Sequence, residues 1–270
     1  MGYKLTNMDN IMREQRNKYK TELHLAAASK TAGSSGYIIT ELTEEMFLSY
    51  PAHCLKKILL GNNSIYSVHP KAFHYLTSLE VLDLANNSIT LLYPNIFTQM
   101  PGLQVLKLEH NHIAIINPDA FAGLSNLREL YLNHNYLTFI NPCIFMGLNN
   151  LTTLALNNSY ITTLYPDAFK GLTSLTELNL DDNNIATIHP NAFRGLTSLE
   201  MLDLTNNNIT IICEFTFDDL TSLVVLYLQD NNITEIPSQV NNFLSNKWLN
   251  LDIDLANLKI TGKNNYDDDY

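Results

Sequence analysis

Carboxylate side chains gather in one part of the sequence, where chemistry could take place. Asp181 and Asp182 are neighbours in the chain, and Glu177 and Asp203 lie a short distance before and after them. Paired carboxylates can act as general acid and base, but neither a candidate nucleophile nor a closed pocket accompanies this group. We therefore expect that the protein is not an enzyme. An acidic cluster of this kind is better suited to meet a basic or mixed-charge protein surface.

Two histidines raise the question of a metal site. His110 and His134 occupy equivalent places in neighbouring copies of a repeat, and Glu109 directly precedes the first of them. Imidazole and carboxylate groups are common zinc ligands. The equivalent place is taken by Asn62 and Asn86 in other copies, so it accepts polar residues in general. We expect neither a metal nor another cofactor.

The elements that must position these residues come from a 24-residue repeat. Each copy follows the pattern Leu-x-x-Leu-x-Leu-x-x-Asn-x-Ile-x-x-Ile-x-Pro-x-Ala-Phe-x-Gly-Leu-x-x, and residues 175–198 match it at every position. The copies begin at Leu55, Leu79, Leu103, Leu127, Leu151, Leu175, Leu199 and Leu223. Self-similarity at a fixed period indicates a solenoid, in which each unit packs on its neighbours.

Each part of the repeat predicts a part of the coil. Apolar positions 1, 4 and 6 alternate with outward positions 3 and 5, which predicts a short strand in a parallel sheet. The asparagine at position 9 can pair the backbone groups of the following turn, and Ser159 replaces it once with a shorter side chain. The proline at position 16 suits the start of a short helical turn, and the phenylalanines at position 19 should stack. We predict a curved α/β solenoid with a concave parallel β-sheet and short helical turns or loops on the convex side.

The two ends of the chain depart from the repeat. Residues 1–36 are polar with a modest basic excess; within them, 8–29 could form a helix and 33–36 resemble a flexible hinge. The organisation we expect is an N-terminal extension (1–36), an N-terminal capping half-repeat (37–54), eight repeats (55–246), a C-terminal cap (247–262) and a disordered acidic tail (263–270).

This pattern resembles the leucine-rich repeat family, in particular its typical 24-residue subclass, over about residues 39–258. The resemblance implies a horseshoe-shaped solenoid that binds proteins mostly through its concave face. The typical subclass is common in extracellular receptors and matrix proteins, which usually carry four-cysteine caps at both ends and a signal peptide. This sequence shows neither feature, which favours an intracellular scaffold.

Charge and cysteine content bear on partners and location. The net charge of −11 argues against nucleic acid, because nucleic-acid binders show a basic footprint. No stretch approaches the roughly 18 to 20 apolar residues that span a membrane. Cys54, Cys143 and Cys213 lie several repeats apart, too far to pair in the predicted stack, as expected in a reducing compartment. An intracellular location is favoured, an extracellular one stays open, and the oligomeric state is not predicted.

The outward positions 3 and 5 should form the binding surface, because packing does not dictate their residues. Tyrosine and methionine there are typical of interface cores, and the carboxylates add charge. The residues that we expect to contact a partner are Glu129, Tyr131, Glu177, Asn179, Met201, Asp203 and Tyr227. The leading hypothesis is a protein–protein interaction module that uses its concave face. Two alternatives remain: an extracellular or cell-surface recognition ectodomain, and an effector that recruits an enzyme through its N-terminal extension.

Overall fold

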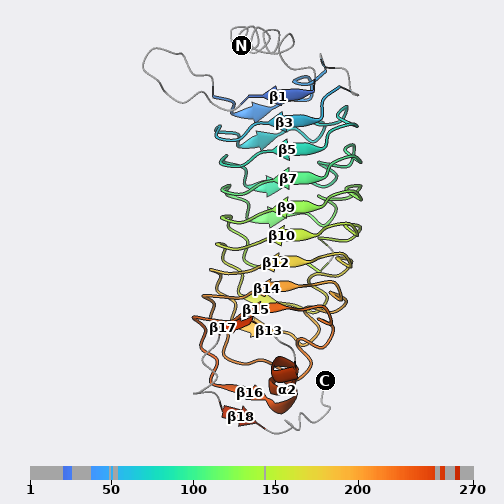
Figure 1. Ribbon diagram of the computed structural model, residues 1–270. Coiled ribbons are helices and arrows are strands. Elements are labelled where there is room, and N and C mark those ends of the chain that lie inside the picture. The colour runs from blue at the N-terminus through green and yellow to red at the C-terminus, as the bar shows by residue number, and fades with distance from the viewer. Residues whose placement is uncertain are drawn as a thin grey trace.

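The chain winds into stacked coils whose strands follow one another along a single axis (Figure 1). The computed structural model describes residues 21–25, 38–48, 50, 54–142, 144–246, 250–252 and 259–261. One side of the coils is a ten-stranded parallel sheet in the order β1-β3-β5-β7-β9-β10-β12-β14-β15-β17. The predicted solenoid with a parallel sheet is confirmed.

The strands of this sheet follow the period of the sequence. They are β1 (Glu22–His24), β3 (Lys57–Leu59), β5 (Val81–Asp83), β7 (Val105–Lys107), β9 (Glu129–Tyr131), β10 (Thr153–Ala155), β12 (Glu177–Asn179), β14 (Met201–Asp203), β15 (Val225–Tyr227) and β17 (Asn250–Asp252). Neighbouring strands pair residues of equal repeat position, for example Leu154 with Leu178. In β5, Leu82 is buried, whereas Val81 and Asp83 keep part of their surface exposed. The inward and outward alternation therefore follows the repeat as predicted.

The other side of each coil, which we call the return side, contains turns and very short strands. These strands are β2 (Glu41–Leu42), β4 (Ser67–Val68), β6 (Leu91–Leu92), β8 (Ile115–Ile116), β11 (Thr163–Leu164), β13 (Thr187–Ile188), β16 (Glu235–Pro237) and β18 (Lys259–Thr261). They pair in twos. In the described part of the chain the only helix is α2 (Ser238–Asn246). The rest of the return side consists mostly of turns closed by bonds between residues three apart, such as Ala72 N to His69 O at 2.8 Å, which fits the predicted short helical turns or loops.

The N-terminal end differs from the prediction. Residues 22–24 do not belong to a helix over 8–29, because they form β1 and pair in parallel with β3. Leu23 and Leu25 alternate like positions 4 and 6 of a repeat, and both are buried in the core. Without β1, the edge of β3 would have unpaired backbone groups. Residues 21–25 pair with these groups, for example through the bond from Leu25 N to Leu59 O at 2.8 Å. The expected hinge and the acidic tail lie outside the described residues.

Stacked phenylalanine rings run along the inside of the return side. The predicted stack is confirmed, with successive ring centroids 5.9–6.3 Å apart, and it comprises Phe47, Phe73, Phe97, Phe121, Phe145, Phe169, Phe193, Phe217 and Phe243. The eighth repeat has Asn241 where phenylalanine is expected. Helix α2 shifts the aromatic residue by two places, so that Phe243 continues the stack on Phe217. Sequence periodicity alone missed this last ring.

An asparagine amide joins seven of the eight repeats to the coil before them. Asn87 Nδ2 donates to Leu84 O of its own repeat at 3.0 Å and to Leu60 O of the preceding repeat at 3.1 Å. Its Oδ1 accepts from Ile65 N of the preceding repeat at 2.9 Å. The same three bonds recur at Asn63, Asn111, Asn135, Asn183, Asn207 and Asn231. This amide ladder pairs backbone groups that would otherwise be buried without partners.

Restoring the missing member of the amide ladder should stabilise the fold. Ser159 is buried, and its Oγ has no hydrogen-bond partner among the described residues. We expect Ser159→Asn to gain about 1 kcal/mol through the bonds that its equivalents make. The melting temperature should rise by about 2–4 °C, and the reverse change Asn135→Ser should lower it. A lower melting temperature for Ser159→Asn would show that the site cannot accept the amide.

Removing one ring from the phenylalanine stack should destabilise the protein strongly. Phe145 is 1% exposed and lies between Phe121 and Phe169. We expect Phe145→Ala to lower the free energy of unfolding by roughly 3 to 5 kcal/mol, as measured by urea denaturation. Phe139→Ala is the matched control, because that ring is 55% exposed. Equal losses from the two changes would contradict the role assigned to the stack.

Candidate functional site

Five of the seven predicted contact residues lie together on three adjacent strands. The register of the sheet places Glu177 of β12 beside Met201 of β14. It also forms a row in which Asn179 lies beside Asp203, and Asp203 beside Tyr227 of β15. Glu177 is exposed, and the other four are half-buried. This part of the sheet face therefore presents polar, acidic and larger apolar groups next to one another.

The other two predicted residues, Glu129 and Tyr131, lie one strand away on β9. Strand β10 separates them from β12 and carries only Thr153 and Ala155 at its outward positions. Because these side chains are small, the two groups flank a lower strip of the sheet rather than form one continuous cluster. A partner that contacts all seven residues must bridge the strip, a distance of about two strand spacings or 10 Å.

Tyr131 is held in place by its neighbours on the sheet face. Its hydroxyl donates to Glu129 Oε2 at 2.9 Å, and Lys107 Nζ lies 6.0 Å from the ring centroid. Burial, followed by the hydrogen bond to Glu129, raises the pKa of Tyr131 to about 12. The phenol therefore stays protonated at neutral pH. It can present a fixed aromatic surface with little loss of side-chain entropy on binding.

Two carboxylates outside the seven expected contact residues extend this surface, and one of them, Asp181, belongs to the acidic cluster described from the sequence. Asp181 follows β12, and burial raises its pKa to about 6, with further contributions from a hydrogen bond with Asp182 and the negative charge of Asp203. Glu109 follows β7; burial raises its pKa as well, and its Oε2 has no hydrogen-bond partner among the described residues. Both occupy position 7 of the repeat. The sequence indicates that these two side chains face outward, because the alternation that places positions 3 and 5 on the outside continues to position 7.

The two histidines considered as metal ligands stack on each other. The ring centroids of His110 and His134 lie 4.0 Å apart at an angle of 10°. Burial and the nearby His110 lower the pKa of His134. Over the described residues, no three His, Cys, Asp or Glu side chains are grouped in a way that could hold a metal ion. Cys54 and Cys213 are free thiols, and Cys143 lies outside the described residues.

Position 8 of the repeat has an unusual backbone conformation. Its residues have φ between 50° and 58°, namely Asn62, Asn86, His110, His134, Asn158, Asp182, Asn206 and Asp230. Asparagine, aspartate and histidine are the side-chain-bearing residues that tolerate this left-handed region best. The backbone therefore explains why only these residue types occupy the position, independently of any metal.

The chain belongs to the leucine-rich repeat family. The model of that family matches residues 54–113, 113–158, 149–209 and 202–252, which together cover more than half of the chain. A search of curated proteins found no match. No helix among the described residues is long and apolar enough to cross a membrane.

Several solved structures share the fold. The complex of TLR13 with ssRNA13 matches with a TM-score of 0.75 and 30% identity, over 84% of this chain and 32% of that one. A chain of the octameric complex of latrophilin 3, Unc5D and the leucine-rich repeat protein FLRT2 matches with a TM-score of 0.69 and 27% identity. The match covers 79% of this chain and 66% of that one. A chain of the glycosylated Drosophila Toll–Spatzle complex matches with a TM-score of 0.73 and 24% identity, over 78% of this chain and 28% of that one. At this identity the match shows the fold alone. This chain spans only about a third of the TLR13 chain.

The raised pKa of Asp181 predicts a pH-dependent effect on stability. The pKa rises from the usual 3.8 to about 6 on folding, so the folded state binds more protons between these values. The ionised carboxylate therefore lowers stability at pH 7, and this loss disappears as the pH falls towards 4. We expect Asp181→Asn to melt at a higher temperature than the wild type at pH 7, with the difference shrinking by pH 4. A constant difference across that range would contradict the assignment.

Proposed function

We propose that this protein is a non-enzymatic interaction module that binds a partner protein through its sheet face. The observation that carries the proposal is the outward surface between β9 and β15, where tyrosine and methionine lie among carboxylates. Interface cores are enriched in aromatic residues and methionine, and complementary charge increases the rate and specificity of association. The similarity to a chain of the FLRT2-containing octameric complex supports a role in protein assembly.

The charge of the sheet face supports a basic or mixed-charge partner. Glu129, Glu177, Asp181 and Asp203 all lie on or beside the strands from β9 to β14. The nearest outward cation on the sheet is Lys107 of β7, which lies over the ring of Tyr131. TLR13 was solved with single-stranded RNA, but a polyanion would be repelled by this surface and by the net charge of −11. A protein with exposed lysine or arginine is the better complement.

We propose an intracellular location for the protein, independently of its binding surface. The free thiols of Cys54 and Cys213 support an intracellular protein. The likeness to the TLR13 chain supports the alternative, a recognition ectodomain. Expression in a secretory cell distinguishes the two, because an ectodomain should be exported in folded form. Retention or misfolding there, with all thiols free in native material, supports the intracellular location.

The alternative of an N-terminal recruiting segment is tested by a truncation that keeps strand β1. Strand β1 shows that residues 21–25 belong to the sheet, so deletion of 1–36 would remove a strand. The informative truncation therefore removes residues 1–20 only. Undiminished partner capture by this truncation would support binding through the sheet face. Lost capture, with unchanged melting, would support recruitment through the N-terminal segment.

Removing the acidic charge of the sheet face should weaken partner binding without unfolding the protein. We expect Glu177→Lys with Asp203→Lys to reduce binding of proteins captured from native extract at least about tenfold, since two complementary charges become repulsive. Quantitative mass spectrometry of the captured proteins measures the effect. Asp203 Oδ1 also accepts from Thr205 N at 2.9 Å. The milder pair Glu177→Gln with Asp203→Asn retains an acceptor there, and it should have an intermediate effect.

The matched control reverses two exposed carboxylates on the return side, Asp119→Lys with Asp218→Lys. This variant changes the net charge by the same amount but leaves the sheet face intact. It should therefore capture the same partners as the wild type. Equal losses in the two double variants would show that net charge, rather than the sheet face, governs binding. No loss in either would place the binding site elsewhere.

A further inference from the structure

A groove of about 610 Å³ runs along the solenoid where the sheet strands end. It crosses five repeats, from His110 to Asn208, and its walls come from positions 8 and 10 of each repeat. The ladder residues of position 9 lie between the walls. Its length, about four strand spacings or 19 Å, suits a chain-like ligand that lies parallel to the solenoid axis. The groove is separate from the outward positions 3 and 5 of the sheet face.

The wall at position 8 is a continuous row of polar side chains. Its residues are His110, His134, Asn158, Asp182 and Asn206. The Asp182 carboxylate accepts from Asn158 Nδ2 at 3.3 Å and from Asn206 Nδ2. One carboxylate thus links the amides of the repeats on either side of it. These bonds fix the orientation of donors and acceptors in advance, which lowers the entropy cost of binding.

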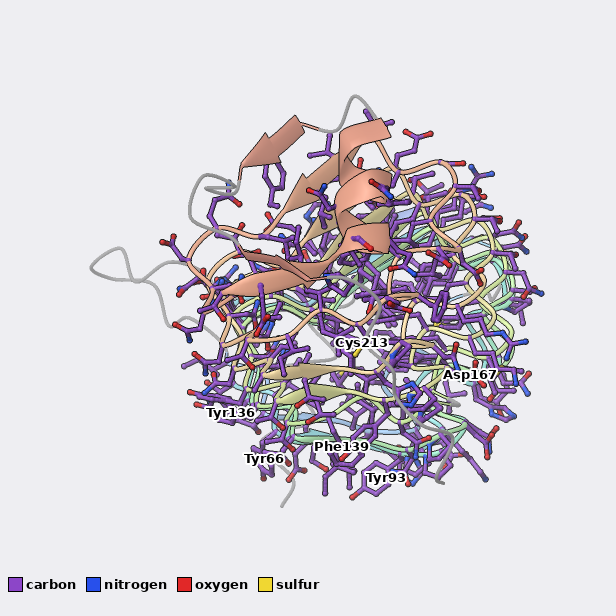
Figure 2. All side chains as sticks on the ribbon, turned by 90° about the horizontal axis from the view of Figure 1, so that it is seen from below. Tyr66, Tyr93, Tyr136, Phe139, Asp167 and Cys213 are labelled. Carbon is purple, nitrogen blue, oxygen red and sulfur yellow. The ribbon has the colours of Figure 1, made fainter. Side chains whose placement is uncertain are left out.

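The wall at position 10 begins with aromatic rings and ends with amides. Its residues are His112, Tyr136, Tyr160, Asn184 and Asn208. The rings of His112 and Tyr136 stack at 5.3 Å, and those of Tyr136 and Tyr160 lie 5.7 Å apart at an angle of 52°. Tyr136 and Tyr160 are 47% and 52% exposed. In the view along the stack, Tyr136 lies at the outer edge of the body (Figure 2).

The composition of the walls restricts the class of ligand. Of the described residues that line the groove, none is lysine or arginine and none is aliphatic, and Asp182 is the one carboxylate. Phosphates and other anions would find no cation there. A peptide with apolar anchors would find no apolar pocket. Amides, imidazoles and phenols both donate and accept, so they suit a neutral ligand rich in hydroxyl groups.

The spacing of the walls favours sugars over an extended peptide. Equivalent side chains recur once per repeat, at about the 4.8 Å separation of neighbouring strands. This is close to the length of one pyranose ring along an extended glycan chain. Side chains on one side of an extended peptide recur only at about 6.6 Å, so they would fall out of step with the walls.

We propose that this groove binds a chain of neutral sugars. The hydroxyl groups contact the polar row at position 8, and the sugar rings lie against Tyr136 and Tyr160. The site is independent of the partner surface on the sheet, so either proposal can fail alone. Binding should be insensitive to salt, because no charge on the ligand takes part.

The test uses full-length protein from a bacterial host, since Asn208 begins an Asn-x-Thr sequon that a secretory cell could glycosylate. The probes are an array of neutral oligosaccharides of glucose, mannose, galactose and N-acetylglucosamine, with acidic glycans and extended peptides on the same array. The oligosaccharide retained best is then titrated by calorimetry. Two groove variants are compared with the wild type: Tyr136→Ala with Tyr160→Ala, and Asn184→Ala with Asn208→Ala. The matched control is Tyr93→Ala with Tyr165→Ala, two exposed tyrosines outside the groove.

We expect a neutral oligosaccharide to bind the wild type and the control equally. Each groove variant should bind it at least about tenfold more weakly while melting cooperatively, as loss of a stacking or hydrogen-bonding pair implies. Retention of no neutral oligosaccharide would overturn the proposal. So would binding that both groove variants leave unchanged, or retention of peptides or acidic glycans alone.

Discussion

The structure depends on a buried side-chain amide that is shared between neighbouring repeats. Asn87 shows the arrangement: its donor joins carbonyls of two successive coils, and its acceptor takes the N–H of Ile65. Backbone groups in the coil's interior cannot be left unpaired without a cost of about 1 to 3 kcal/mol each. The amide therefore fixes one coil on the next in a single register. Residues of equal position come to lie in columns, on the outside as well as in the core.

The columns in the core determine the stability of the fold, whereas the columns on the outside are available to contact a partner. The leucine and phenylalanine columns are occupied by nearly the same residue in every repeat, because each must fill the same space. Positions 3, 5 and 7 on the sheet carry no such constraint, and there the acidic and aromatic residues concentrate between β9 and β15. The residue type at position 8 is less restricted than in the core columns but more restricted than at positions 3, 5 and 7. Its backbone restricts it to asparagine, aspartate or histidine, and this restriction gives the groove a polar wall.

The sequence predicted the parts of the fold that the period governs, and it missed those that depend on the ends or on several columns together. The core, the sheet and the phenylalanine stack follow from residue spacing alone. Strand β1 was missed because it forms only where the edge of β3 offers backbone partners, and Phe243 because α2 shifts it by two places. For the site, adjacency of Glu177 with Met201 was predictable from the period. The raised pKa of Asp181 was not predictable, since its largest cause is burial.

Carboxyl footprinting of the protein, free and with its captured partner bound, tests the central claim most directly. A water-soluble carbodiimide labels exposed carboxylates, and mass spectrometry locates the labels residue by residue. Our account predicts that the partner protects Glu177 and Asp203, while Asp119 and Asp218 on the return side stay equally reactive. Protection of the return-side carboxylates, with Glu177 and Asp203 unchanged, would contradict the assignment of the sheet face as the binding surface.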